Sequence, residues 1–170
     1  MLSMLTTDQK GVLAEQAIVF EALKLGAGVF QPVGDERYDL ILDLRPDLMR
    51  VQCKWATRAG AVVQIRTRRC RRGPEGLIHR AYELGEIDAI AAYCADLDRC
   101  YLLPLEMSVG RAMVQLRLAP SKNNQHLRIN WARDFEFGAT LQQLRGPIAQ
   151  LGERLSGTQK VAGSIPAGST

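Results

Sequence analysis

Residues 37–55 decide the fold, and they read RYDLILDLRPDLMRVQCKW. On both sides of the central Arg-Pro-Asp, apolar and polar side chains alternate with the period of two that is typical of a half-buried strand. The apolar side chains of the two halves fall on one face: Tyr38, Leu40, Leu42, Leu44, Met49, Val51, Cys53 and Trp55. The opposite face carries Asp39, Asp43, Gln52 and Lys54. The stretch therefore predicts a β-hairpin with one apolar and one polar face.

The position of the turn sets which residues of this hairpin lie opposite each other. Proline presets φ and aspartate supplies turn hydrogen bonds, so we expect a tight turn at Pro46-Asp47. That turn places Asp39 opposite Lys54. It also keeps both apolar sets on the same face, which a slip of one residue would not do.

Three residues of the polar face, Asp39, Gln52 and Lys54, suit phosphodiester hydrolysis. A carboxylate can hold a hard cation. Such a metal ion polarises a phosphate and acidifies water, while a lysine ammonium can orient that water or stabilise developing charge. The alternative is the exposed polar face of an ordinary hairpin, because alternating charge is common on half-buried strands.

An aspartate on one strand, followed by Gln52-Cys53-Lys54 on the next, resembles the signature of the PD-(D/E)XK nuclease superfamily. Gln52 stands where that signature usually has a second acid, which removes one negative charge from the site. Glutamine at this position is similar to the group I intron-associated homing endonucleases of the superfamily. The similarity covers most of residues 8–137. Its supporting segments are residues 10–15, 39–55, 88–101, 123–125 and 130–132.

The resemblance implies an α/β fold with a restriction-endonuclease-like core, in which a mixed β-sheet is backed by an N-terminal helix. It implies that Mg²⁺ or Mn²⁺ is held by Asp39, the carbonyl of Cys53 and Glu15. Gln52 would position water or metal, and Lys54 would assist the nucleophile. For Glu15, a glutamate in water on the flank of the helix is an equally good interpretation.

The activity that the resemblance implies is site-specific, homing-type cleavage of double-stranded DNA. Cutting both strands implies two active sites, so we expect a homodimer or a homotetramer. Two alternatives remain open. One is a structure-specific nuclease, such as a junction resolvase or a repair enzyme. The other is a catalytically inactive DNA-binding protein, in which Gln52 marks decay of the site.

Basic residues are concentrated between residues 50 and 80, where nine arginines and lysines accompany a single acid, Glu75. Such a run indicates binding to a polyphosphate. The predicted strand 61–68 sends Gln64, Arg66 and Arg68 to one face, where they could read base edges or clamp phosphates. Further predicted DNA contacts are Arg69, Arg71 and Arg72 in an expected basic loop, residues 69–76, and Lys122, Asn123 and Asn124 in a polar loop. A solubilising surface loop is the alternative in both places.

Thr6 and Gln9 predict a capping box for a helix that reaches Leu25 and ends at Gly26. Its expected apolar face consists of Leu13, Ala17 and Phe20, widened by Ala14, Ile18 and Leu25. Alternation predicts further strands over residues 29–33, 61–67, 88–94, 100–105 and 113–118.

The 170 residues, 46% of them hydrophobic, allow one modest domain, which we place at residues 1–144. The chain has neither a membrane-length apolar run nor a signal-peptide pattern, so we expect a cytoplasmic protein. The four cysteines form no CxxC pair and predict neither zinc nor disulfides.

Residues 145–170 are rich in small residues, and we expect a disordered or loosely ordered tail. Residues 148–153 and 163–166 can be encoded by D-arm and T-arm sequences of a bacterial tRNA gene, so we hypothesise that the tail is read through one.

Overall fold

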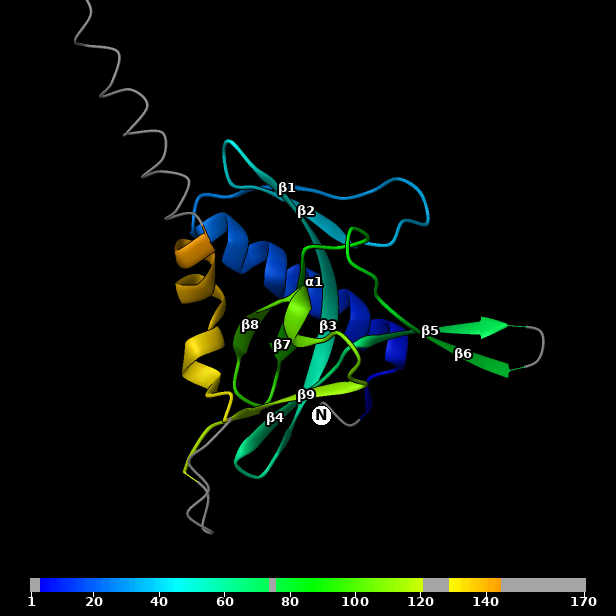
Figure 1. Ribbon diagram of the computed structural model, residues 1–170, viewed down its shortest axis with the longest axis vertical. Helices are drawn as coiled ribbons and strands as arrows, with labels where there is room; N and C mark the ends of the chain where they lie inside the picture. Colours follow the sequence, from blue (N-terminus) through cyan, green and yellow to red (C-terminus); the bar gives the residue numbers. More distant parts are fainter. Residues whose placement is uncertain (1–3, 74–75, 121–128, 145–170) are drawn as a thin grey trace, which may run out of the picture.

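A computed structural model of the chain describes residues 4–73, 76–120 and 129–144, without the side chains of residues 69–73 and 77–79. Figure 1 shows a central sheet crossed by a long helix, with a two-stranded arm projecting to one side. The tail 145–170, with its hypothetical origin in a tRNA gene, lies outside the described residues, as do Lys122, Asn123 and Asn124. Within the described ranges, no helix is long and apolar enough to cross a membrane.

The N-terminal helix α1 (Thr7–Lys24) begins with the predicted capping box. The Gln9 amide donates to Thr6 Oγ1 at 3.2 Å, and the Thr6 amide donates to Gln9 Oε1 at 2.9 Å. These bonds satisfy backbone donors that have no partner inside the helix. The helix gives way to Gly26, whose φ of 72° lies in the left-handed region that glycine adopts readily.

The predicted apolar face of α1 is confirmed in part. Ala14 and Ile18 are buried, and Ala17 and Leu25 pack partly buried against the core, whereas Leu13 and Phe20 are 42% and 62% exposed. Ala22, which was not predicted, completes the buried face. Apolar residues occur around the whole circumference of α1, so periodicity alone does not select one face. The small alanines spaced eight residues apart let the helix approach the sheet closely, and Ile18 fills the space between them.

The main sheet is mixed and has β3 (Leu48–Ala59) at its centre. Residues 48–51 of β3 pair antiparallel with β2 (Leu40–Asp43), and residues 51–56 pair parallel with β7 (Ala89–Cys94). β1 (Gly28–Phe30) pairs with β2 on its other side and is shorter than the strand predicted over residues 29–33. This long central strand connects the two ends of the sheet (Figure 1).

The remaining strands lie where alternation predicted them. β8 (Arg99–Pro104) pairs with β7, while β4 (Val62–Arg66) pairs with the last residues of β3 and with β9 (Met113–Arg117). Two short 3₁₀ helices are η2 (Leu105–Met107) and η3 (Ala132–Phe135). Residues 137–144 are also helical, an element that our sequence analysis does not predict.

The predicted hairpin is present, but its register differs by two residues. Leu40 lies opposite Val51 and Leu42 lies opposite Met49, so Asp39 is level with Gln52 and not with Lys54. The turn is centred one residue earlier than predicted, because the Leu44 amide donates to the Asp47 carbonyl at 2.9 Å. A shift of two residues leaves both apolar sets on one face, which is why the hydrophobic pattern did not reveal it.

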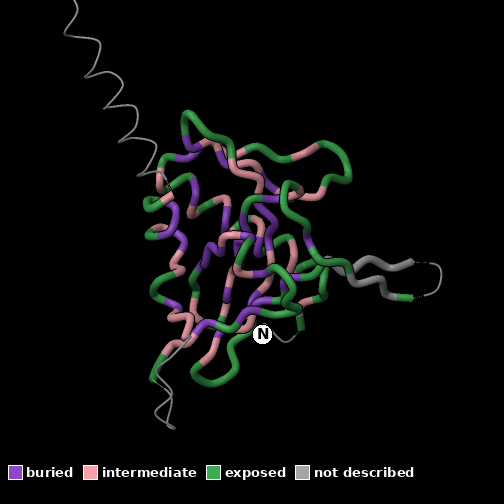
Figure 2. Tube along the Cα trace, in the orientation of Figure 1, coloured by how far each residue is buried: buried purple, intermediate pink, exposed green. Residues whose placement is uncertain are grey.

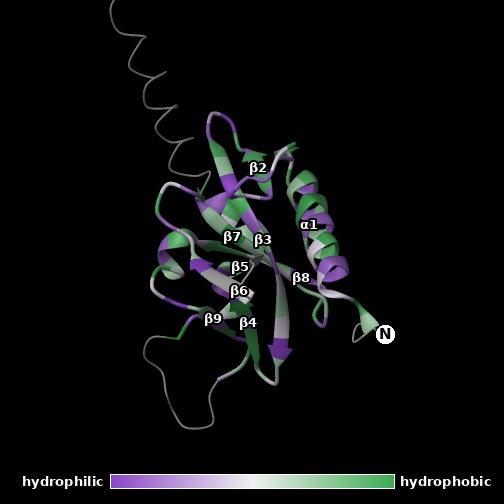
Figure 3. Cartoon of the chain, turned by 90° about the vertical axis from the view of Figure 1, so that its right-hand side faces the viewer, coloured by the Kyte–Doolittle hydropathy of each residue, from purple (hydrophilic) through white to green (hydrophobic). Residues whose placement is uncertain are grey.

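Two hydrophobic clusters cover the two faces of the sheet, because neighbouring residues of β7 and β8 point to opposite sides. The first cluster packs under α1 and residues 137–144, and includes Ile18, Leu42, Val51, Cys53, Leu102, Phe137 and Leu141. The second cluster includes Ala56, Ile65, Tyr82, Ile90, Tyr101, Leu103 and Leu116. Figure 3 shows α1 as a separate layer beside the strands. Buried positions are concentrated in the central strands (Figure 2).

The expected basic loop, residues 69–76, is instead part of a second β-hairpin. β5 (Arg68–Gly73) pairs antiparallel with β6 (Gly76–Ala81), and together they form a separate two-stranded sheet. This hairpin projects from the body of the molecule (Figure 1). The density of arginines hid the strand pattern, because residues 69–72 show no alternation of apolar and polar residues.

Candidate active site

Asp39 is held at the entrance to β2 by three hydrogen bonds to β3. Its backbone amide donates to the Val51 carbonyl at 3.0 Å. Its Oδ2 atom accepts hydrogen bonds from Gln52 Nε2 and, at 2.7 Å, from the Cys53 backbone amide. Gln52 is only 8% exposed. The carboxylate is therefore fixed in direction by two donors of the neighbouring strand.

Glu15 of α1 faces the same site. Partial burial and the negative charge of Asp39 raise the pKa of the Glu15 carboxyl above its ordinary value. The effect of Asp39 shows that two carboxylates repel each other across the site. A cation between them would relieve that repulsion.

A cavity of about 320 Å³ opens beside these residues. Its lining comes from α1, from the segment between β1 and β2, and from β3, and consists of Glu15, Gln31, Pro32, Gly34, Asp35, Glu36, Tyr38, Asp39 and Gln52. Four of the lining residues are acidic and none is basic. This composition favours a cation over an anion inside the cavity.

The donor set fits a hard divalent cation that takes only some of its ligands from the protein. Among the residues that the structure describes, no three His, Cys, Asp or Glu side chains converge closely enough to form a complete metal cage. Mg²⁺ typically uses one or two carboxylates and completes its shell with water and substrate phosphate. Asp39 and Glu15 supply such a pair. The predicted metal ligands therefore suit a site that is completed by substrate.

Lys54 lies two residues beyond Gln52 on β3, and so on the same face of the strand. Its Nζ atom donates a hydrogen bond of 3.0 Å to the Tyr82 hydroxyl and lies 5.3 Å from the centre of that ring. Tyr82 is not among the predicted catalytic residues. The sequence gives no signal for this contact, because the two residues are brought together by the fold.

The Cys53 side chain points away from the polar face into the cluster under α1. Burial, followed by the charges of Asp39 and Glu15, raises the pKa of the Cys53 thiol well above its ordinary value, against a smaller opposite effect of Lys54. Asp39, Glu15 and Lys54 are therefore close enough to Cys53 to influence its thiol electrostatically. They also keep the thiol neutral, so only the Cys53 carbonyl remains available as the predicted ligand.

The predicted DNA contacts that the structure describes fall on β4 and β5. Gln64 and Arg66 lie two residues apart on β4, and Arg66 is exposed. Arg68 is exposed at the start of β5, and Arg69, Arg71 and Arg72 follow on that strand. Lys122, Asn123 and Asn124 remain predictions, since they lie outside the described residues.

An ion pair between Arg50 and Asp88 supports β3, the strand that carries Gln52 and Lys54. The Arg50 backbone amide and side chain donate to Asp88 at 2.7 to 3.1 Å, and Arg50 Nη1 also donates to the Gly85 carbonyl. Burial acts to raise the pKa of Asp88, but the bonds from Arg50 outweigh it, and the Asp88 pKa lies below its ordinary value. The pair fixes the start of β7 against β3.

Comparisons with known proteins agree with this geometry. A sequence model of the PD-(D/E)XK endonuclease family matches residues 5–138. The chain is similar to the solved structure of a bacterial homing endonuclease, I-Ssp6803I, with 26% identity and a TM-score of 0.67. That match covers 86% of this chain and 99% of the other. No curated protein matches the chain. The predicted restriction-endonuclease-like fold, a mixed sheet with an N-terminal helix, is confirmed.

Proposed function

Since the chain belongs to the PD-(D/E)XK endonuclease family, we propose that it is a homing-type nuclease that cuts double-stranded DNA at a specific site. The observation that carries this proposal is the arrangement around Asp39. Its carboxylate is oriented by Gln52 at an acidic cavity, and Lys54 lies on the same strand face. The similarity to a homing endonuclease supports the homing type. We also propose an association with a group I intron, which the resemblance of Gln52-Cys53-Lys54 implies.

Nucleases of this family generally use divalent metal ions, and we propose Mg²⁺ or Mn²⁺ for this chain. Asp39 and Glu15 would hold the ion, together with the Cys53 carbonyl. When bound, it would polarise the scissile phosphate and acidify a water molecule. The other donors of the shell would be water and the phosphate itself.

The remaining roles belong to side chains of β3. The Gln52 amide fixes the direction of the Asp39 carboxylate, and it does so without adding negative charge. The Lys54 ammonium would stabilise charge that develops on the phosphate, or orient the attacking water. Both roles depend on position more than on reactivity, because phosphate hydrolysis is accelerated chiefly by placement and electrostatics.

DNA capture would involve the basic arm. Arg66, Arg68 and the arginines that follow on β5 would contact phosphates, which supply most of the affinity of a DNA-binding protein. Cutting both strands requires two such sites, so we propose a homodimer or homotetramer acting on a symmetric or nearly symmetric target.

The test is cleavage of supercoiled plasmids carrying cloned genomic segments, with Mg²⁺ and with EDTA. The proposal predicts Mg²⁺-dependent linear product with ends at one position, mapped by sequencing. Cleavage of four-way junctions or flaps, with intact duplex left uncut, would favour a structure-specific nuclease instead. Binding without cleavage under Mg²⁺ and Mn²⁺ would favour an inactive DNA-binding protein.

A further inference from the structure

We propose that Tyr82 is a positioning residue for Lys54 in DNA cleavage, an inference that rests on the function proposed above. Tyr82 follows directly after β6 and is only 5% exposed. It packs in the second hydrophobic cluster, on the sheet face that also carries Lys54. It is therefore a buried side chain that reaches the proposed catalytic lysine from a different part of the chain.

The hydrogen bond to Tyr82 defines where the Lys54 ammonium lies. The Tyr82 hydroxyl accepts this bond from Nζ at 3.0 Å, and Nζ lies 5.3 Å from the ring centre, beyond the hydroxyl end of the ring. A lysine stem has several rotatable bonds, so its charge occupies many positions unless it is restrained. The hydrogen bond sets both a direction and a distance for the ammonium. It thereby preorganises the charge that the proposed reaction uses.

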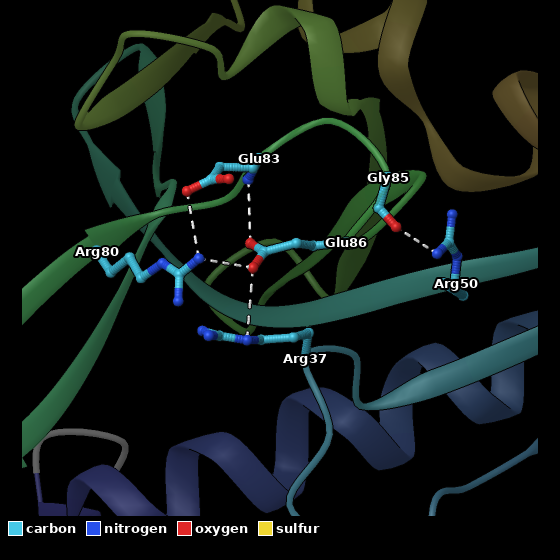
Figure 4. A network of polar contacts seen from close by, with 6 residues as sticks. All are labelled: Arg37, Arg50, Arg80, Glu83, Gly85 and Glu86. Carbon is cyan, nitrogen blue, oxygen red and sulfur yellow. Dashed lines mark hydrogen bonds and ion pairs between the residues drawn. The ribbon is translucent and has the colours of Figure 1, made fainter.

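Residues on both sides of Tyr82 in the sequence form a network of polar contacts (Figure 4). Arg80 donates to Glu83 at 3.2 Å and to Glu86 at 2.9 Å. The Glu83 amide donates to Glu86 at 3.1 Å, and Arg37 forms an ion pair with Glu86 at 3.5 Å. Arg37 lies two residues before the site aspartate. The segment that carries Tyr82 is thus tied to the residues that lead into β2 at Asp39.

The placement also connects DNA capture to chemistry. Tyr82 continues from the basic hairpin without an intervening loop. The element proposed to grip DNA and the residue that supports Lys54 therefore belong to one continuous segment. Tyr82 therefore does more than fill the core, because its hydroxyl accepts a hydrogen bond from the proposed catalytic Lys54.

The first test compares Tyr82→Phe with Tyr101→Phe. Both residues belong to the same cluster, but the Tyr101 hydroxyl is buried with no hydrogen-bond partner among the described residues. Tyr82→Phe should lower the single-turnover cleavage rate at saturating DNA and Mg²⁺ by about tenfold, the equivalent of about 1.4 kcal/mol. The DNA dissociation constant should stay unchanged. Tyr101→Phe should leave both quantities unchanged.

A double-mutant cycle distinguishes positioning from general structural support. If Tyr82 acts through Lys54, adding Tyr82→Phe to Lys54→Met should not reduce the residual cleavage further. An equal additional loss in the Lys54→Met background would overturn the proposal.

A second measurement does not depend on cleavage. Acetic anhydride labelling followed by mass spectrometry reports how freely each lysine reacts, with the exposed Lys24 as internal reference. Lys54 should be acylated faster in Tyr82→Phe than in wild type, and at the wild-type rate in Tyr101→Phe. An unchanged Lys54 rate in Tyr82→Phe would overturn the positioning role. If wild type cuts no DNA, the proposed function fails, while these rates still decide whether Tyr82 holds Lys54.

Discussion

Replacing Gln52 with glutamate restores the acid that the family signature usually has at this position, and tests the geometry around Asp39 directly. In the structure, Gln52 Nε2 donates to Asp39 Oδ2, and Gln52 is only 8% exposed. Gln52→Glu exchanges this donor for a second carboxylate at the same place. Two carboxylate oxygens would then face each other across a hydrogen-bond distance, with little water to screen them.

The cost can be worked out from that distance. Two unit charges about 3 Å apart repel by about 5 kcal/mol at an effective dielectric constant of about 20. Taking up one proton avoids the repulsion, and at pH 7 protonating a glutamate with a pKa of about 4.3 costs about 4 kcal/mol. The smaller cost applies, so Gln52→Glu should lower the free energy of unfolding by about 4 kcal/mol at pH 7.

The dependence on pH gives the prediction a clear sign. The introduced carboxyl has a folded-state pKa raised above its unfolded value, so the deficit is absent below the unfolded pKa and grows as pH rises. Between about pH 5 and pH 7 the deficit should grow by about 1.4 kcal/mol per pH unit. Urea unfolding with EDTA at several pH values measures it. Mg²⁺ should reduce the deficit, because a bound cation would offset the repulsion between the two carboxylates in place of the proton.

Gln115→Glu is the matched control, because Gln115 is exposed on β9. It should change stability by less than about 0.5 kcal/mol and show no pH dependence. If Gln52→Glu were as stable as wild type at pH 7 without metal, the contact between Gln52 and Asp39 would not exist as described.

Three further predictions concern the helix, the metal site and the anchoring ion pair. Ile18→Ala should lower the free energy of unfolding in urea by about 3 kcal/mol, because Ile18 is buried. Phe20→Ala should lower it by about 1 kcal/mol or less, because Phe20 is 62% exposed. The reverse order would contradict the helix face that the structure buries. Glu15→Gln should weaken Mg²⁺ binding, measured by calorimetry, by at least about tenfold, the lower end of the loss seen for outer partners of metal sites. It should also remove a rise in wild-type affinity as pH increases through the raised Glu15 pKa, and equal Mg²⁺ affinity would exclude Glu15 as a ligand. Asp88→Asn should cost about 1 kcal/mol at pH 7, allowing for the exposure of its ion pair with Arg50. Because the Asp88 pKa is lowered, this stabilisation is present above its ordinary value of 3.8 and is lost as pH falls through the folded value, so a difference that does not shrink as pH falls below 3.8 would contradict it.

The hairpin of β2 and β3 shows which features of the fold could be predicted from the sequence and which could not. Alternation identified both strands and their apolar face, because the period of two is a direct consequence of strand geometry. It could not locate the turn, since a shift of two residues preserves every face. The pairing of Asp39 with Lys54 was therefore wrong, although the same residues remain together at the site.

Contacts between distant segments were the other limit. The order of strands, with β7 inserted parallel beside β3, is not encoded in any local pattern, yet it sets the face on which Tyr82 meets Lys54. The helix over residues 137–144 did have a signal, in the spacing of Phe137, Leu141 and Leu144. Residues 69–72 had none, because a basic strand and a basic loop can have the same composition.

The most direct measurement is DNA binding and cleavage in parallel for wild type, Asp39→Ala and Lys54→Ala, with Asp43→Ala as control. Asp43 is an aspartate of the same hairpin that pairs with Arg45 and does not line the cavity in the part of the chain that the structure describes. Gel-shift titration in Ca²⁺ gives the affinity, and single-turnover cleavage in Mg²⁺ gives the rate. We expect Asp39→Ala and Lys54→Ala to bind the target as tightly as wild type and to cut it only at a low residual rate, while Asp43→Ala binds and cuts like wild type. Cleavage by Asp39→Ala at the wild-type rate would contradict the assignment of the active site.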